Sequence, residues 1–147
     1  MATPPEKLYQ NYPDNSDLKE AFVYIDTKSL GKERHVFIGW NNGNDSYNRI
    51  IVQQLHLTGG PGNYNFFPLY VSSISSNSLG FKNKVSIGLL SREQRDRMII
   101  LAKTVPFEKK SRSSNCQDWL KSLLEILYQN NLILLTTKDH IINQLTN

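Results

Sequence analysis

The stretch Ser113-Ser114-Asn115-Cys116-Gln117-Asp118-Trp119-Leu120 carries the single cysteine of the chain at a point where the residue pattern predicts the start of a helix. Ser114 is a favourable N-cap, because its hydroxyl can accept a hydrogen bond from a free backbone N–H of the first turn. Gln117, three residues later, completes the capping-box pattern. Apolar side chains then recur at helical spacing, which predicts an amphipathic helix from about residue 115 to residue 129. These apolar positions are Trp119, Leu120, Leu123, Leu124 and Leu127.

Cys116 lies one turn before Trp119 and Leu120 and therefore shares the apolar side of this helix. A thiol at a helix N-terminus is close to free backbone N–H groups and to the positive end of the helix dipole, which predicts a lowered thiol pKa. The same N–H groups can hold a developing oxyanion. The alternative is that Cys116 is a small buried apolar residue, a common environment for a free cysteine. From the helix alone, this alternative is the favoured one.

Length and composition indicate one globular domain. The chain has 147 residues, with 39% hydrophobic and 20% charged residues, which is ordinary for a soluble globular protein with a substantial core. The net charge of +4 is mild. The basic cluster of Lys109, Lys110 and Arg112 indicates a solvated loop or a weak attraction for an acidic partner. No basic helix with interleaved aromatic residues is present in the sequence, so nucleic-acid binding is not expected.

Cysteine usage and hydropathy bear on the compartment. A single cysteine excludes an internal disulfide and fits a reducing compartment. Residues 1–6 lack the apolar core of a signal peptide, and no apolar run reaches the length of a membrane span. We therefore expect a cytoplasmic protein with no membrane span. No metal-ligand spacing links the histidines to Cys116, so neither a metal nor another cofactor is expected.

The order of elements predicts an α+β fold, in which helices pack on an antiparallel sheet. The polar, proline-containing residues 1–17 are expected to form a flexible arm before a single domain over residues 18–147. Strands are expected at 21–26, 34–40, 49–57, 68–75 and 84–90, with a short strand at 132–135. Helices are expected from Ser91 to before Pro106, over 115–129, and from Thr137 to about Leu145.

Two histidines, His35 and His56, are expected on neighbouring strands. Side chains alternate along a strand, so His35 shares a face with Phe37, and His56 shares a face with Gln54. If the two strands pair as a hairpin, both imidazoles can lie near each other. A cysteine nucleophile needs such a base within hydrogen-bond reach and a further group that orients the base. The alternative is two ordinary strand histidines, which residue types alone favour.

Three segments together resemble circularly permuted papain-like cysteine enzymes of the lecithin:retinol acyltransferase and NlpC-type branch. They are His35-Val36-Phe37-Ile38-Gly39, Leu55-His56-Leu57 and Asn115-Cys116-Gln117-Asp118-Trp119. The chain is more closely similar to a set of short, uncharacterised fungal proteins with a His strand, a His-x-Thr-Gly segment and an Asn-Cys-Gln-x-Trp helix. The resemblance covers about residues 21–133. It departs from the acyltransferases in a longer interval between the histidines, in Val36 after the first histidine, and in the lack of a hydrophobic C-terminal anchor.

The resemblance implies a permuted papain-like domain. It would act on an amide or ester through a thioester, either as a peptidase-like thiol hydrolase or as an acyltransferase. Cys116 would be the nucleophile, His35 the general base and His56 the residue that orients or polarises His35. The substrate would be a protein, a peptide or a small molecule that carries an acyl group. Candidate substrate-binding residues are Trp40, Gln54, Gly59, Gly60, Asn115 and Gln117.

Two alternatives stay open. The glycines at 59 and 60 could let the backbone approach a ligand closely, or they could simply be turn residues. The whole domain could be catalytically inactive and bind a protein partner through an aromatic groove. That groove would be formed by Trp40, Tyr64, Phe66 and Phe67.

Overall fold

The computed structural model describes residues 5–26, 35–60, 62–74, 82–111 and 116–146. Their central element is a five-stranded sheet in the order β6-β3-β2-β1-β7, in which every neighbouring pair is antiparallel. The predicted α+β class with an antiparallel sheet is therefore confirmed. The five strands are β1 (Lys19–Asp26), β2 (Val36–Asn44), β3 (Ile50–Leu55), β6 (Tyr70–Ile74) and β7 (Lys82–Leu90).

The β2–β3 hairpin forms as the sequence predicts. Its turn is held by the Asp45 carboxylate, which accepts hydrogen bonds from the backbone N–H groups of Tyr47 and Arg49. Asn48 has a φ of 59°, the left-handed conformation that asparagine tolerates in turns. The register places Ile38 opposite Leu55. The beginning of β2 therefore lies beside the end of β3, where the two histidines are found.

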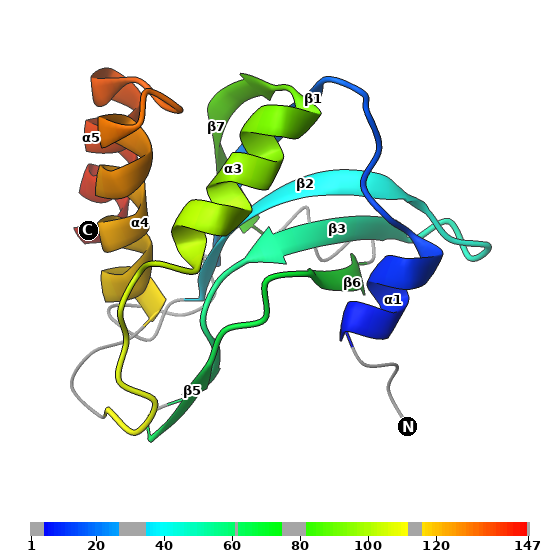
Figure 1. Ribbon diagram of the computed structural model, residues 1–147, viewed down its shortest axis with the longest axis horizontal. Coiled ribbons are helices and arrows are strands. Elements are labelled where there is room, and N and C mark those ends of the chain that lie inside the picture. The colour runs from blue at the N-terminus through cyan, green and yellow to red at the C-terminus, as the bar shows by residue number, and fades with distance from the viewer. Residues whose placement is uncertain (1–4, 27–34, 61, 75–81, 112–115, 147) are drawn as a thin grey trace.

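Helices α3 (Arg92–Ala102), α4 (Cys116–Gln129) and α5 (Leu135–Thr146) lie together on one side of the sheet, as Figure 1 shows. The predicted capping box at the start of α3 is present: the Ser91 hydroxyl accepts from the Gln94 N–H, and the Gln94 side chain accepts from the Ser91 N–H. The predicted apolar stripe of α4 is buried along its whole length. Ser114, the expected N-cap of α4, lies outside the described residues.

The two faces of the sheet belong to different clusters, because side chains alternate along a strand. Val36 and Ile38 of β2 pack in the main core with the apolar stripe of α4. Phe37, between them, packs instead with Tyr24 and Val52 in a second cluster. Side chains that group with Phe37 therefore lie on the face of the sheet opposite the helices.

A second, two-stranded sheet is formed by β4 (Thr58–Gly60) and β5 (Asn63–Asn65), which the sequence did not predict as strands. Gly59 has a φ of +86°, and a Cβ at this position would overlap the carbonyl oxygen of Asn63. Only glycine fits there, so the turn requirement explains this residue. Residues 109–111 run along the hairpin: the Gly62 N–H donates to the Ser111 carbonyl at 2.8 Å, and the Tyr64 N–H donates to the Lys109 carbonyl at 2.7 Å.

Residues 5–17 differ from the flexible arm that was expected. Helix α1 (Pro5–Asn11) contacts β6, and Asp14, which follows this helix in the chain, is buried. The Asp14 carboxylate accepts from Arg95 Nε at 2.9 Å and from Lys19 Nζ at 2.9 Å. A buried carboxylate requires such partners. One of them lies 81 residues along the chain, so local composition does not reveal that this segment is part of the folded domain.

The end of α4 also differs from the expectation. No strand forms over 132–135, and α5 begins at Leu135 rather than at Thr137. Asn131 has a φ of 62°, and the Leu132 N–H donates to the Leu127 carbonyl, as in a left-handed helix C-terminus. A tight turn between two helices therefore takes the place of the expected short strand. Within the described residues, no helix combines the length and apolar character that a membrane span needs.

Candidate functional site

Cys116 is the first residue of α4 and is half-buried against the main core. Its sulfur, as thiolate, accepts hydrogen bonds from the backbone N–H groups of Val36, Cys116 and Gln117. The last two belong to the first turn of the helix, whose N–H groups have no partner within the helix. Val36 is the first residue of β2. The sulfur therefore lies where the N-terminus of α4 meets the beginning of β2, two ends that are neighbours in Figure 1.

Burial raises the pKa of the Cys116 thiol above its ordinary value. The three N–H groups act in the opposite direction without cancelling this effect, and the negative charge of Asp118 adds to the rise. The predicted lowering of the pKa was therefore wrong, because the sequence did not show how deeply the sulfur is buried. A thiol with a raised pKa is mostly protonated at neutral pH, so a nucleophilic role requires a base.

The rings of His35 and His56 lie together, with centroids 5.2 Å apart. The Phe37 ring packs near both imidazoles: its centroid lies 5.6 Å from that of His35 and 5.9 Å from that of His56. The edge of Tyr70 packs on His56, with centroids 4.6 Å apart. The hairpin thus brings the two histidines together, as predicted, and it places them in an aromatic group with Phe37.

The first residues of β2 connect the histidine pair with Cys116. The pair groups with Phe37, whereas the cysteine packs with the main core. His35 directly precedes Val36, whose N–H group contacts the sulfur. Consecutive Cα atoms are about 3.8 Å apart. The Cα atom of His35 therefore lies within a side chain's length of the Cys116 sulfur.

Tyr64 of β5 is a residue that sequence reasoning did not place near the thiol. It is buried, with 5% of its surface exposed. Burial raises the pKa of its phenol, and the nearby Cys116 and Asp118 raise it further. Nothing in the local sequence predicts this proximity, because it depends on a three-residue strand that folds back onto α4. The only local signal is the cluster of glycines before it, which marks a turn.

The expected substrate-binding residues are distributed over several environments. Trp40 is completely buried, and its Nε1–H donates to Asp14 and to the Gln53 side-chain oxygen, both at 3.2 Å. Gln54 is buried two residues before His56 and donates to the Ser72 hydroxyl. None of these three hydrogen bonds involves the cysteine.

The remaining candidates lie closer to α4 or outside the structure. Gln117 is buried, and its backbone N–H is one of the three donors to the Cys116 sulfur. Gly59 and Gly60 belong to the β4–β5 hairpin. Asn115 lies outside the described residues. Of the six candidates, Gln117 is thus the one whose contact with the cysteine is established.

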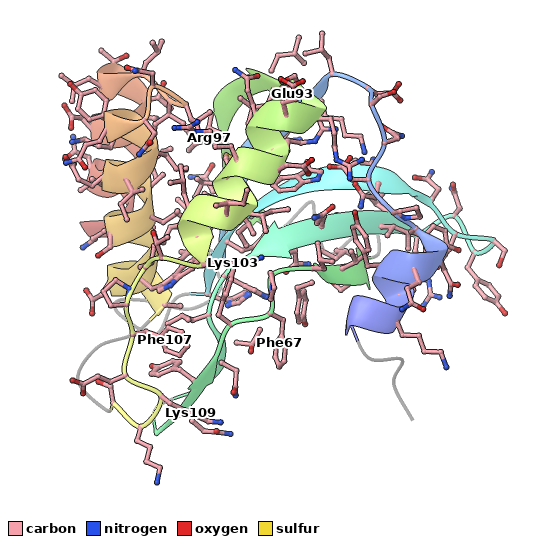
Figure 2. The ribbon with its side chains drawn as sticks, in the orientation of Figure 1. Phe67, Glu93, Arg97, Lys103, Phe107 and Lys109 are labelled. Atoms are coloured by element: carbon pink, nitrogen blue, oxygen red, sulfur yellow. The ribbon has the colours of Figure 1, made fainter. Side chains whose placement is uncertain are left out.

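The aromatic residues of the expected partner groove are mostly inside the molecule. Trp40 and Tyr64 are buried, and the half-buried Phe66 lies against Trp119 with ring centroids 5.3 Å apart. Phe67 is 38% exposed. Figure 2 shows Phe67 and Phe107 on either side of the β4–β5 hairpin and Lys109 near its tip. The four residues therefore do not form one open groove.

Within the described residues, no three His, Cys, Asp or Glu side chains gather in a way that could hold a metal ion.

Comparisons with family models, with curated proteins and with solved structures find no significant match for this chain.

Proposed function

We propose that the chain is a cysteine-dependent hydrolase or acyltransferase with a permuted papain-like arrangement, acting on an amide or ester through a thioester at Cys116. One observation carries the proposal: the Cys116 sulfur at the N-terminus of α4 accepts a hydrogen bond from the Val36 N–H, and Val36 directly follows His35. A nucleophilic atom and backbone N–H donors therefore lie at the ends of two elements, and the residue that carries the imidazole is the next one along the chain.

Burial raises the pKa of the Cys116 thiol, so the reaction needs a general base, and in this proposal His35 has that role rather than that of a permanent ion-pair partner. His35 takes the thiol proton while the sulfur forms a bond to the carbonyl carbon, and the carbonyl π electrons move to the oxygen. Collapse of this intermediate breaks the bond to the leaving alcohol or amine, which receives the proton from His35. Water, or another acceptor, then releases the acyl group from the sulfur.

His56 has the supporting role in this scheme. Its ring centroid lies 5.2 Å from that of His35, and the ring also packs against Phe37 and Tyr70. These ring contacts restrict the orientation of His56, which can therefore orient or polarise His35. The substrate class is a protein, a peptide or a small molecule with an acyl group, and the chemistry requires no cofactor.

A second candidate is an inactive papain-like domain that binds a protein partner. The observation that favours it is the raised pKa of the Cys116 thiol, because a buried, protonated thiol is usually inert. The mostly internal positions of Trp40 and Tyr64 do not favour it, since these residues were expected to form the partner groove. Reactivity of the cysteine toward acyl donors separates the two candidates.

The test is acylation by activated esters of several chain lengths, followed at neutral pH by intact mass. The wild type should gain one acyl group, and Cys116→Ser should not gain a thioester. General acid–base catalysis contributes about 10² to 10⁴ in rate, so His35→Ala should slow acylation by a factor in that range. His56→Gln should slow acylation less than His35→Ala does, because a neutral amide can still hold the His35 ring by a hydrogen bond.

Circular dichroism of each variant controls for folding. A wild type that is never acylated by any of the esters would support the inactive binding domain. If folded His35→Ala is acylated as fast as the wild type, His35 has no part in the mechanism, even though Cys116 is reactive.

A further inference from the structure

We propose that the Tyr64 hydroxyl is the second oxyanion donor in the reaction at Cys116, alongside the backbone N–H of Cys116 itself. This inference rests on the proposed function and adds to it a catalytic side chain from outside the three motif segments. It also assigns a role to the β4–β5 hairpin, which would bring the hydroxyl to the carbonyl oxygen of the substrate.

The position of Tyr64 follows from how the hairpin packs on α4. Phe66 lies against Trp119, which is one turn after Cys116. Alternate residues of an extended chain point to the same side, so Tyr64 shares the side of Phe66. Tyr64 and Cys116 both belong to the main core, and Cys116 lies near enough to the Tyr64 phenol to raise its pKa.

The backbone holds the tyrosine in place. The Tyr64 N–H donates to the Lys109 carbonyl at 2.7 Å, and the Gly62 N–H donates to the Ser111 carbonyl at 2.8 Å. These bonds fix β5 to the segment that leads toward α4. A catalytic donor needs such support, because its hydrogen bond must be preorganised for the charge that develops.

The hydroxyl itself is available to a ligand. Among the residues that the structure describes, no hydrogen bond occupies the Tyr64 hydroxyl, although the residue is 95% buried. Burial, Cys116 and Asp118 together raise the pKa of this phenol, so it keeps its proton at neutral pH. It therefore remains a hydrogen-bond donor.

The chemical requirement matches this donor. When the Cys116 sulfur forms its bond to the carbonyl carbon, negative charge develops on the carbonyl oxygen. The backbone N–H of Cys116 supplies one hydrogen bond to that oxygen, and the Tyr64 O–H would supply the other. The tyrosine keeps its own proton throughout, so the proton transfers between the thiol, His35 and the leaving group are unchanged.

The experiment compares Tyr64→Phe with the wild type in two reactions of the same sulfur. Acylation by an activated ester forms an oxyanion, whereas alkylation by iodoacetamide does not. Loss of one oxyanion donor typically costs about 10² to 10³ in rate. Tyr64→Phe should show that loss in acylation and an unchanged alkylation rate, because the ring and its packing are retained.

Tyr128→Phe is the matched control. Tyr128 is half-buried and lies on α4, toward its other end, with its ring under the Lys138 ammonium at 4.7 Å. This variant should be acylated and alkylated at wild-type rates. Melting temperatures of both variants measure any loss of stability separately from chemistry.

The outcomes separate this inference from the proposed function. If the wild type is acylated and Tyr64→Phe is acylated equally fast, the tyrosine is not an oxyanion donor, while the proposed function stands. If acylation and alkylation fall together in Tyr64→Phe, the residue only supports the position of the thiol, and the inference is overturned. A wild type that is never acylated overturns the proposed function, and the role of Tyr64 with it.

Discussion

The reactivity of Cys116 is set by opposing influences on one sulfur atom. Burial raises its pKa, whereas the N–H groups of Val36, Cys116 and Gln117 lower it. The rise is the larger effect, so the residue resembles a buried thiol more than the activated thiolate of a helix N-terminus. Asp118 contributes to the rise from an exposed position, which makes it the simplest residue to change.

Replacing Asp118 by Asn should lower the pKa of the Cys116 thiol, because the variant removes a negative charge that disfavours thiolate. The pH midpoint of the iodoacetamide reaction should be above the ordinary value of about 8.5 in the wild type. It should move toward lower pH in the variant, and the difference should shrink at high salt.

Asp139→Asn removes a comparable exposed carboxylate from α5 and should leave the midpoint in place. Asp118 also lies in the first turn of α4, where a carboxylate favours the helix. Thermal melting therefore accompanies the titration. An unchanged or raised midpoint in folded Asp118→Asn would contradict this account of the thiol.

At the residue scale, the sequence identified the position of Cys116 at a helix start and the proximity of His35 to His56. Those follow from helix periodicity and from a hairpin turn, both of which are local patterns. The burial of the sulfur and the approach of Tyr64 depend on contacts between distant segments. No local pattern encodes them, which is why the predicted direction of the thiol pKa was wrong.

Among the elements, α4 carries the largest continuous part of the core. Leu123 on α4 is completely buried, and it belongs to the main cluster together with Val36 and Ile38 of β2. The helix therefore holds Cys116 against the sheet through its whole apolar stripe. Its position was predictable because five apolar side chains repeat at helical spacing.

Leu123→Ala should lower the free energy of unfolding by about 2 to 5 kcal/mol, since it removes buried methyl groups and leaves a cavity. Urea denaturation measures the change. Leu134→Ala is the control, because Leu134 is 71% exposed and its truncation should cost little. Equal stability of the two variants would mean that α4 does not pack on the sheet through this stripe.

The β4–β5 hairpin was the element that sequence reasoning missed. Its strands have only three residues each, too few for an alternating pattern to be visible. The glycines around it indicated a loop, and the positive φ of Gly59 shows that the backbone does turn sharply there. What could not be predicted is that residues 109–111 would pair with it.

For the whole molecule, Asp14 joins the N-terminal segment to the rest of the domain. Burial alone would raise the pKa of Asp14, but hydrogen bonds from Arg95 and Lys19, and from the Asn15 N–H, outweigh it and hold the pKa below its usual range. Trp40 Nε1–H donates to the same carboxylate. One side chain thus connects the segment after α1 with α3, β1 and β2.

Asp14→Asn should destabilise the fold, because it leaves the Arg95 guanidinium, which is completely buried, without its counter-charge. Breaking a buried ion pair by removing one partner typically costs about 3 to 5 kcal/mol. Asp96→Asn is the control, since it breaks the more exposed Arg92–Asp96 pair on α3, where the loss should be about 1 kcal/mol or less.

The stability difference between wild type and Asp14→Asn should also depend on pH. A lowered pKa means that the folded state favours the ionised carboxylate, so the stabilisation is present above the unfolded-state pKa of about 3.9. It is lost as the pH falls through the lower folded-state value. The stability difference between wild type and Asp14→Asn should therefore be constant near neutral pH and shrink below about pH 4. A difference that is independent of pH would contradict this role of Asp14.

The fold class was predictable at this scale because the order of strands followed by helices leaves few architectures. The extent of the domain was not, since the partners of Asp14 lie far along the chain. The hydrogen bond between Arg95 and Asp14 spans 81 residues, and no propensity or periodicity reports such a pair. Charged residues that become buried are the features that a sequence shows least clearly.

Acyl transfer to Cys116 is tested by the mass of the wild-type protein after reaction with activated acyl esters at neutral pH, compared with that of Cys116→Ser. We expect one added acyl group on the wild type, located at Cys116 by peptide mapping and absent from that position in the serine variant. A wild type that stays unmodified while its cysteine remains reduced, or an acyl group found only on lysines, would contradict this expectation.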